Sequence, residues 1–210
     1  MTETAPSADT RPAVVLKPVH NMHHTAYRCR DAEQTRWFYE DVLGFKLIAA
    51  LAFDEEPGRA VQREFMHLFF ETTDGNCIAF FDAPDDADES MFVARHGFDQ
   101  HIAFEVENME QLKAWRRHIN KMGRPCFGPI NHHFVHSIYM YDPNGLQVEL
   151  TVKDADYQGI MTRETAKAHA DIQQWTERTR AIKEARLDKN MLDLRGIDTS
   201  KVDLSGMKKI

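Results

Sequence analysis

The 210-residue sequence predicts an α+β protein made of two tandem β-α-β-β-β modules followed by a helical extension. The first observation behind this prediction is an internal repeat. His24 stands seven residues before Asp31, a helix-capping residue, and His101 stands seven residues before Asn108, so the two halves are offset by 77 residues. The second observation is a change of character after residue 154, where apolar residues at helical spacing predict one long amphipathic helix over residues 162–187.

The first module begins with the apolar pattern of a strand over residues 19–29. A helix is predicted to open at Asp31, which has Gln34 at capping-box spacing, and to end at Gly44. Three further strands are predicted at residues 45–53, 62–71 and 77–81. The turn sequence Asp74-Gly75-Asn76 joins the last two of them.

The second module repeats this order of elements. A strand is predicted at residues 101–107, and a helix between its cap at Asn108 and its end at Gly123. Strands follow at residues 125–128, 137–141 and 146–152. The turn Asp142-Pro143-Asn144-Gly145 joins the last two, and Gly145 matches Gly75 at an offset of 70 residues.

These elements define three expected regions. We expect a flexible tail over residues 1–17 and a paired-module domain over residues 18–153, with modules at about 18–83 and about 97–153. Residues 154–210 should form the long helix and an irregular arm. The apolar seam of that helix must be buried, either on the backs of the sheets or on a second subunit, so a homodimer is expected.

Composition excludes several classes of partner. With 33 acidic and 26 basic residues, the net charge of −7 has the wrong sign for a nucleic-acid-binding protein. No apolar run approaches the length of about 20 residues that crosses a bilayer. The three cysteines are odd in number and far apart, which fits neither a disulfide framework nor a zinc ribbon and predicts a cytoplasmic protein.

The 11 histidines are the unusual feature of the composition, because histidine is the commonest metal ligand. His24 and His101 each begin an apolar strand, at equivalent positions of the repeat. A single histidine at a strand start is more often a hydrogen-bonded structural residue. Two at equivalent positions favour a metal site, because internal symmetry brings equivalent strands together around its axis.

Three segments resemble the vicinal oxygen chelate superfamily, which contains glyoxalases, extradiol dioxygenases, thiol transferases and bleomycin-binding proteins. Residues 24–31 (HTAYRCRD) and 37–45 (WFYEDVLGF) are similar to its first module, and residues 137–150 (SIYMYDPNGLQVEL) to the end of its second. The resemblance covers roughly residues 19–152. It implies that the paired modules form a curved mixed sheet around a metal site.

The resemblance also implies the metal ligands. In this superfamily the third ligand is a carboxylate four residues after the turn glycine, which is Glu149 in the second half and is replaced by Ala79 in the first. The implied set is therefore His24, His101 and Glu149. Two histidines and one carboxylate leave open coordination positions and suit non-haem Fe(II) with O₂, although Mn(II) or another divalent metal is the alternative.

The implied chemistry is closest to that of extradiol-type dioxygenases, which need groups that move protons. By position, the resemblance places the acid–base histidine at His132 and a tyrosine at Tyr139, while His133 or His136 could serve instead of His132. Residues 125–152 contain no Lys or Arg to hold a phosphonate, and their aromatic side chains fit a flat aromatic substrate better.

The expected function is thus an Fe(II)-dependent, ring-cleaving oxidoreductase in aromatic catabolism, acting on a small catechol-like substrate and O₂. One alternative is a glyoxalase- or thiol-transferase-like lyase or transferase that uses Mn(II) or another divalent metal. The other is a metal-free, drug-sequestering protein that binds a small molecule. The sequence leaves open whether the metal site closes within one chain or between two.

Overall fold

The computed structural model describes residues 15–59, 61–187 and 189–192. Residues 1–14 of the expected tail over residues 1–17, and the expected arm over residues 193–210, lie outside the described residues. The first module contains, in order, β1 (His24–Cys29), α1 (Ala32–Arg36), the π-helical segment η1 (Trp37–Val42), β2 (Lys46–Glu56), β3 (Val61–Glu71) and β4 (Cys77–Asp82). Two short 3₁₀ segments, η2 (Pro84–Asp86) and η3 (Glu89–Phe92), lead to the second module.

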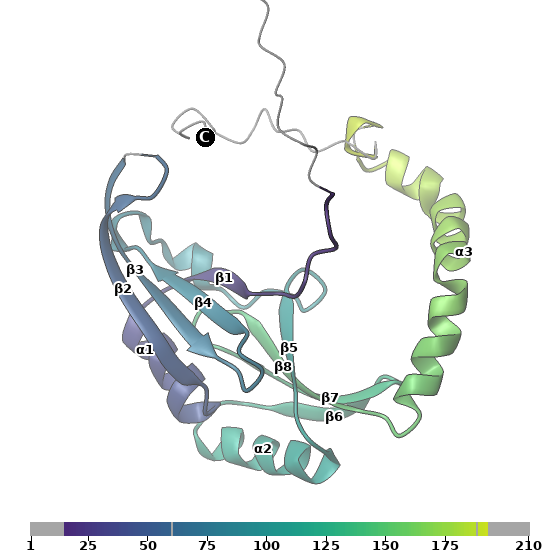
Figure 1. Ribbon diagram of the computed structural model, residues 1–210, viewed down its shortest axis with the longest axis horizontal. Coiled ribbons are helices and arrows are strands. Elements are labelled where there is room, and N and C mark those ends of the chain that lie inside the picture. Colours follow the sequence, from purple (N-terminus) through teal and green to yellow (C-terminus); the bar gives the residue numbers. More distant parts are fainter. Residues whose placement is uncertain (1–14, 60, 188, 193–210) are drawn as a thin grey trace, which may run out of the picture.

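The second module contains β5 (His101–Glu105), α2 (Met109–Lys121), β6 (Phe127–Asn131), β7 (Val135–Tyr141) and β8 (Gln147–Lys153). The long helix α3 (Tyr157–Glu184) and the 3₁₀ segment η4 (Lys189–Leu192) follow. Figure 1 shows both modules and the long helix. The predicted α+β class, the two β-α-β-β-β modules and the C-terminal helix are therefore confirmed.

Each module forms one four-stranded mixed sheet, with strand order β1-β4-β3-β2 in the first and β5-β8-β7-β6 in the second. The first strand of each module runs parallel to the last, and the other pairs are antiparallel. The register between the first and last strands is equivalent in the two modules: Ala26 pairs with Ala79 in the first, and Ala103 pairs with Glu149 in the second. The repeat that the spacing predicts is thus a structural repeat.

The predicted helix caps are present in both modules. The Asp31 carboxylate accepts the backbone N–H of Gln34 at 2.8 Å, and the Asn108 side-chain oxygen accepts that of Gln111 at 2.9 Å. Each bond satisfies a donor that the first turn of a helix leaves unpaired. Both helices therefore begin just after the predicted caps.

A single hydrophobic core joins the two modules. It contains Phe38 and Tyr39 from η1, Leu112 and Ile119 from α2, and the core-facing side chains of both sheets. The buried Tyr39 hydroxyl also donates to Asp142 at 3.1 Å, which ties the first module to the β7–β8 turn of the second. The helices thus pack between the modules, and the opposite faces of the two sheets are left open for a site.

Several predicted boundaries are shifted, and two of them differ most. Residues 19–23, predicted as part of the first strand, precede β1, because the ladder with β4 starts at the His24–Cys77 pair. The long helix begins at Tyr157, five residues earlier than predicted, directly after a turn in which the Tyr157 N–H donates to the Asp154 carbonyl. Among the described residues, no helix has both the length and the apolar character to span a membrane.

Candidate functional site

The open face of the second sheet brings two of the three predicted metal ligands together. His101 begins β5, and Glu149 lies on β8, the strand hydrogen-bonded to β5. His101 Nε2 is 3.5 Å from Glu149 Oε2. Two donors that each lie about 2.1 Å from one ion are roughly 3 to 3.5 Å apart, so this pair fits two ligands of one metal. Glu149 is only 6% exposed.

A hydrogen bond of His101 sets its ring for metal binding. Its Nδ1 lies 2.6 Å from the carbonyl oxygen of Gly97, and because a carbonyl only accepts, Nδ1 carries the proton and donates. In the neutral ring, Nε2 then has a lone pair that faces the Glu149 carboxylate. Two electron-rich groups that face each other, one of them the buried Glu149 carboxylate, are stabilised by a cation between them.

Tyr139 and His132 lie beside this pair. Tyr139 is the cross-strand partner of Glu149 in the β7–β8 ladder, and its hydroxyl is 2.8 Å from His132 Nε2. Burial raises the pKa of Tyr139, and the negative charge of Glu149 acts in the same direction. The phenol therefore stays protonated at neutral pH and shares a hydrogen bond with His132.

The other two histidines of the predicted acid–base cluster point elsewhere. Successive residues of a strand alternate faces, so His136 lies on the opposite face of β7 from Tyr139. There its Nε2 is 3.3 Å from Asp154 Oδ2. His133 is exposed and has a left-handed backbone (φ 74°) in the β6–β7 connection. Of the three histidines, His132 is the one held beside Tyr139 and Glu149.

The third predicted ligand, His24, lies on the other sheet. Its Nδ1 is 2.8 Å from His23 Nδ1, and its ring contacts those of His67 and Phe69, with centroids 6.4 and 5.5 Å away. All of these residues belong to the first half of the chain. Within the described residues, no three His, Cys, Asp or Glu side chains gather closely enough to hold a metal ion. The structure therefore brings together His101 and Glu149 but not His24.

His67 is a candidate functional residue that the sequence did not reveal. It lies on β3 with its ring stacked on Phe81, with centroids 3.8 Å apart. Its Nε2 is buried and has no hydrogen-bond partner among the described residues. Burial lowers the pKa of His67, and nearby His24 lowers it further. Only the cross-strand register places His67 near His24, because the two residues are 43 positions apart in sequence.

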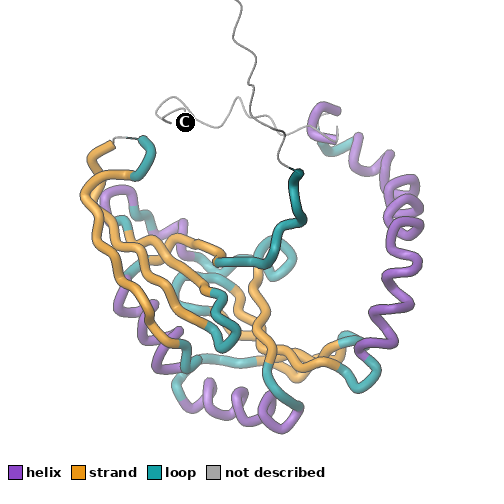
Figure 2. Tube along the Cα trace, in the orientation of Figure 1, coloured by secondary structure: helices purple, strands orange, loops and turns teal. Residues whose placement is uncertain are grey.

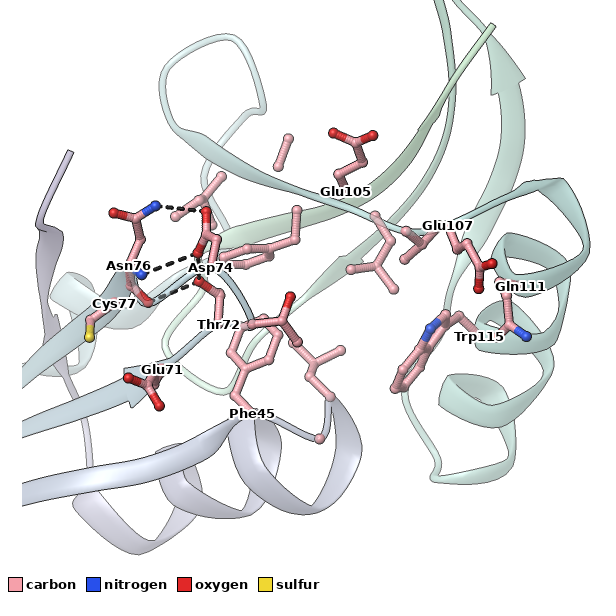
Figure 3. A pocket seen from close by; sticks show the side chains of 18 of the residues that line it. Phe45, Glu71, Thr72, Asp74, Asn76, Cys77, Glu105, Glu107, Gln111 and Trp115 are labelled. Carbon is pink, nitrogen blue, oxygen red and sulfur yellow. Dashed lines mark hydrogen bonds between the residues drawn. The ribbon is translucent and has the colours of Figure 1, made fainter. Parts of the chain in front are cut away.

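A cleft of about 720 Å³ lies between the two modules. The β3–β4 turn, β5 and α2 line it, and Figure 3 shows the carboxylates of Glu71, Asp74, Glu105 and Glu107 with the indole of Trp115. Asp74 is held within its turn by the amide of Asn76 at 2.7 Å, and Glu105 binds the ammonium group of Lys153. None of the predicted metal ligands lines this cleft, so the candidate site is the open sheet face.

Comparison with solved structures shows a shared fold. A glyoxalase/dioxygenase from Nostoc punctiforme has 22% identity and a TM-score of 0.50, covering 69% of this chain and 99% of that one. A glyoxylase/bleomycin resistance protein/dioxygenase domain from Frankia sp. EAN1pec has 18% identity and a TM-score of 0.51, covering 65% and 99%. The fosfomycin resistance protein FosX from Listeria monocytogenes has 17% identity and a TM-score of 0.50, covering 66% and 98%.

Sequence comparison gives the family. No curated protein matches the chain significantly. Residues 21–150, which span both modules, match the family model described as the Glyoxalase/Bleomycin resistance protein/Dioxygenase superfamily. The modules, their equivalent sheet registers and this match agree, and the chain belongs to the glyoxalase/bleomycin resistance protein/dioxygenase superfamily.

Proposed function

We propose that this protein is an extradiol-type dioxygenase that uses Fe(II) and O₂ to cleave the ring of a catechol-like substrate. One observation carries the proposal: the hydrogen-bonded pair of Tyr139 and His132 lies directly beside Glu149, which faces His101 at 3.5 Å. A two-ligand metal face with a proton-transfer pair at its edge is what ring cleavage requires, because a catechol must lose protons before it reacts.

The third ligand in this proposal is the partner subunit's His24. In one chain, His24 and the His101–Glu149 pair lie on the open faces of different sheets, and the contacts of His24 come from its own sheet and the segment before it. In a two-fold dimer, the first sheet of each subunit can cover the second sheet of the other. Two equivalent sites of two histidines and one carboxylate then form.

His101, Glu149 and the partner subunit's His24 would hold Fe(II), which would supply the activation of O₂ for cleavage of the bound catechol. The protein residues position that ion and move protons. His101 is held in its ligating tautomer by the Gly97 carbonyl. In the tautomer in which His132 Nε2 carries no proton, its lone pair can take a proton from a substrate hydroxyl when the Tyr139 hydroxyl turns toward the substrate.

The partner subunit's His67 would face the same site. In each chain its ring lies beside His24 and Phe81, and its lowered pKa keeps it neutral at pH 7. A neutral imidazole with an unpaired nitrogen can accept a second proton. The stacked Phe81 and the neighbouring Phe69 also offer flat apolar surfaces to an aromatic ring.

Three cations on these sheets, Arg28, Arg63 and Lys153, are already paired, which favours a neutral substrate over a phosphonate. Arg28 binds Asp86 at 2.7 Å, and Arg63 binds the same carboxylate at 2.6 Å. Lys153 binds Glu105 at 2.7 Å. An anionic substrate would have to break one of these pairs, whereas a catechol would not.

The test is oxygen consumption by anaerobically Fe(II)-loaded protein on addition of a panel of catechols, with iron measured by elemental analysis. We expect uptake that depends on catechol and is lost in Glu149→Gln. Glu105→Gln is the matched control, because Glu105 is an exposed carboxylate on the same sheet face that is paired with Lys153. Stoichiometric Fe(II) without oxygen uptake on any catechol would refute the dioxygenase proposal.

A further inference from the structure

Beyond Met161, the long helix α3 is largely exposed and has no packing partner within the described chain. It contains 28 residues, a length of about 42 Å at 1.5 Å per residue. None of its residues is buried by the described part of the chain. Figures 1 and 2 show it leaving the end of β8 and arching away from both sheets. Helices in water gain most of their stability from packing an apolar face, so a partner for this helix is expected.

The apolar seam of α3 has the spacing of a coiled coil. Alternating steps of four and three residues connect Met161, Thr165, Ala168, Ile172, Trp175, Thr179 and Ile182. This 3.5-residue period keeps one narrow seam facing a second helix over three heptads. Its largest side chains, Ile172 and Trp175, are 64% and 53% exposed and lie at adjacent seam positions near the helix centre. The pattern therefore indicates a helical partner rather than the face of a sheet.

Charges beside the seam favour an antiparallel pair. In a parallel pair of identical helices, Arg178 would face the partner subunit's Lys183, a repulsive contact. In an antiparallel pair centred between Ile172 and Trp175, Asp171 faces the partner subunit's Arg178, and the two-fold axis makes this ion pair twice. In the single chain, Arg178 lies over the Trp175 ring at 4.6 Å and Asp171 binds Lys167 at 3.3 Å, and both are exposed.

We propose that α3 is an interaction surface for a second copy of this chain, forming an antiparallel two-helix coiled coil with the partner's α3. Ile172 packs against the partner subunit's Trp175 at the centre, and the small layer of Ala168 against the partner subunit's Thr179 follows on each side. The surface lies on the helix and not on the metal-binding faces, so this pairing does not depend on the proposed reaction.

Cysteine cross-linking tests both the contact and its direction. In the antiparallel pair, the double variant Ala168→Cys/Thr179→Cys places each thiol at position 168 opposite the partner's thiol at position 179, so mild oxidation should give covalent dimers from most chains, and the single variants then decide the direction. The single variants Ala168→Cys and Thr179→Cys should cross-link poorly, because only a parallel pair places identical positions together. The native cysteines Cys29, Cys77 and Cys126 are buried and are shared by all variants.

A control double variant, Ala170→Cys/Glu177→Cys, places both thiols on the outer face of α3 and should not cross-link. Asp171→Lys should lower the yield of the seam pair, and adding Arg178→Glu should restore it. Cross-linking of the outer pair equal to that of the seam pair would overturn the proposal, as would efficient cross-linking of either single variant. Loss of metal binding in Glu149→Gln with cross-linking unchanged would show that the pairing of α3 does not depend on the proposed metal site.

Discussion

The sharpest prediction is that two inactive variants restore one metal site when they share a dimer. His24→Ala removes a ligand from the first sheet, and Glu149→Ala removes one from the second. Each variant alone should lose its metal, because every site in its homodimer lacks a ligand. In the mixed dimer, the Glu149→Ala chain supplies an intact His24, and the His24→Ala chain supplies the intact pair of His101 and Glu149.

The magnitude follows from this division of ligands. A mixed dimer has one complete site and one that lacks both ligands, so it should hold about half the metal of the wild-type dimer under two-fold symmetry. Unsorted co-expression, in which half of the dimers are mixed, should give about one quarter. Chains carrying two different affinity tags allow the mixed dimer to be purified and its metal measured by elemental analysis.

A matched mixture makes the result specific. His101 and Glu149 lie 3.5 Å apart in the same chain, so a dimer of His101→Ala with Glu149→Ala has no complete site and should hold no metal. Circular dichroism would confirm that each variant is folded. An empty His24→Ala/Glu149→Ala mixed dimer, with a metal-filled wild type, would refute the shared site. Metal retained by His24→Ala alone would refute the ligand assignment.

Three further predictions concern the site and the turn that anchors it. Gly145→Ala should lower the free energy of unfolding by more than Gly75→Ala. The left-handed backbone costs each variant about 1–2 kcal/mol, but a Cβ at Gly145 would also lie 2.2 Å from the Val93 carbonyl oxygen, whereas one at Gly75 meets nothing within 4 Å. Equal denaturant midpoints for the two variants would contradict this. Asp142→Asn should cost about 1–3 kcal/mol in the same assay, because the buried carboxylate accepts four hydrogen bonds from side chains and backbone N–H groups, and an unchanged midpoint would show that these bonds do not contribute. Tyr139→Phe should keep its metal content but lower turnover about 10²-fold, and an unchanged turnover would remove Tyr139 from the proton-transfer pair.

Much of the fold is readable from the sequence because its signals are local. The caps at Asp31 and Asn108 act within one helical turn, and the turn glycines act within four residues. The repeat then gives equivalent positions, so Glu149 and Ala79 can be matched from their spacing to the turn glycines alone. The helix start at Tyr157 was missed because it depends on a turn at Asp154, whose N–H donates to the distant Phe134 carbonyl.

The candidate site was only partly predictable. The sequence places His24, His101 and Glu149 on strands, as the structure does, but their role as metal ligands and the proton-transfer role of His132 and Tyr139 stay predictions. Strand alternation turns His136 away from Tyr139, because the two residues are an odd number of positions apart. The sequence gives that separation but does not show that both residues belong to one strand. The position of His67 beside His24 depends on a register between strands that no local pattern records.

The sequence by itself determined the two modules, their helices and turns, and the two histidines at equivalent strand starts, because these depend on contacts between residues close in the chain. The tertiary structure decided which open faces meet. The modules pack through α1, η1 and α2 into one core, and this places His101 and Glu149 on one open face and His24 on another. That separation depends on how the two sheets pack across the whole domain. Packing is driven by burial of apolar area, which is non-directional and joins residues far apart in the sequence, so no local pattern predicts it.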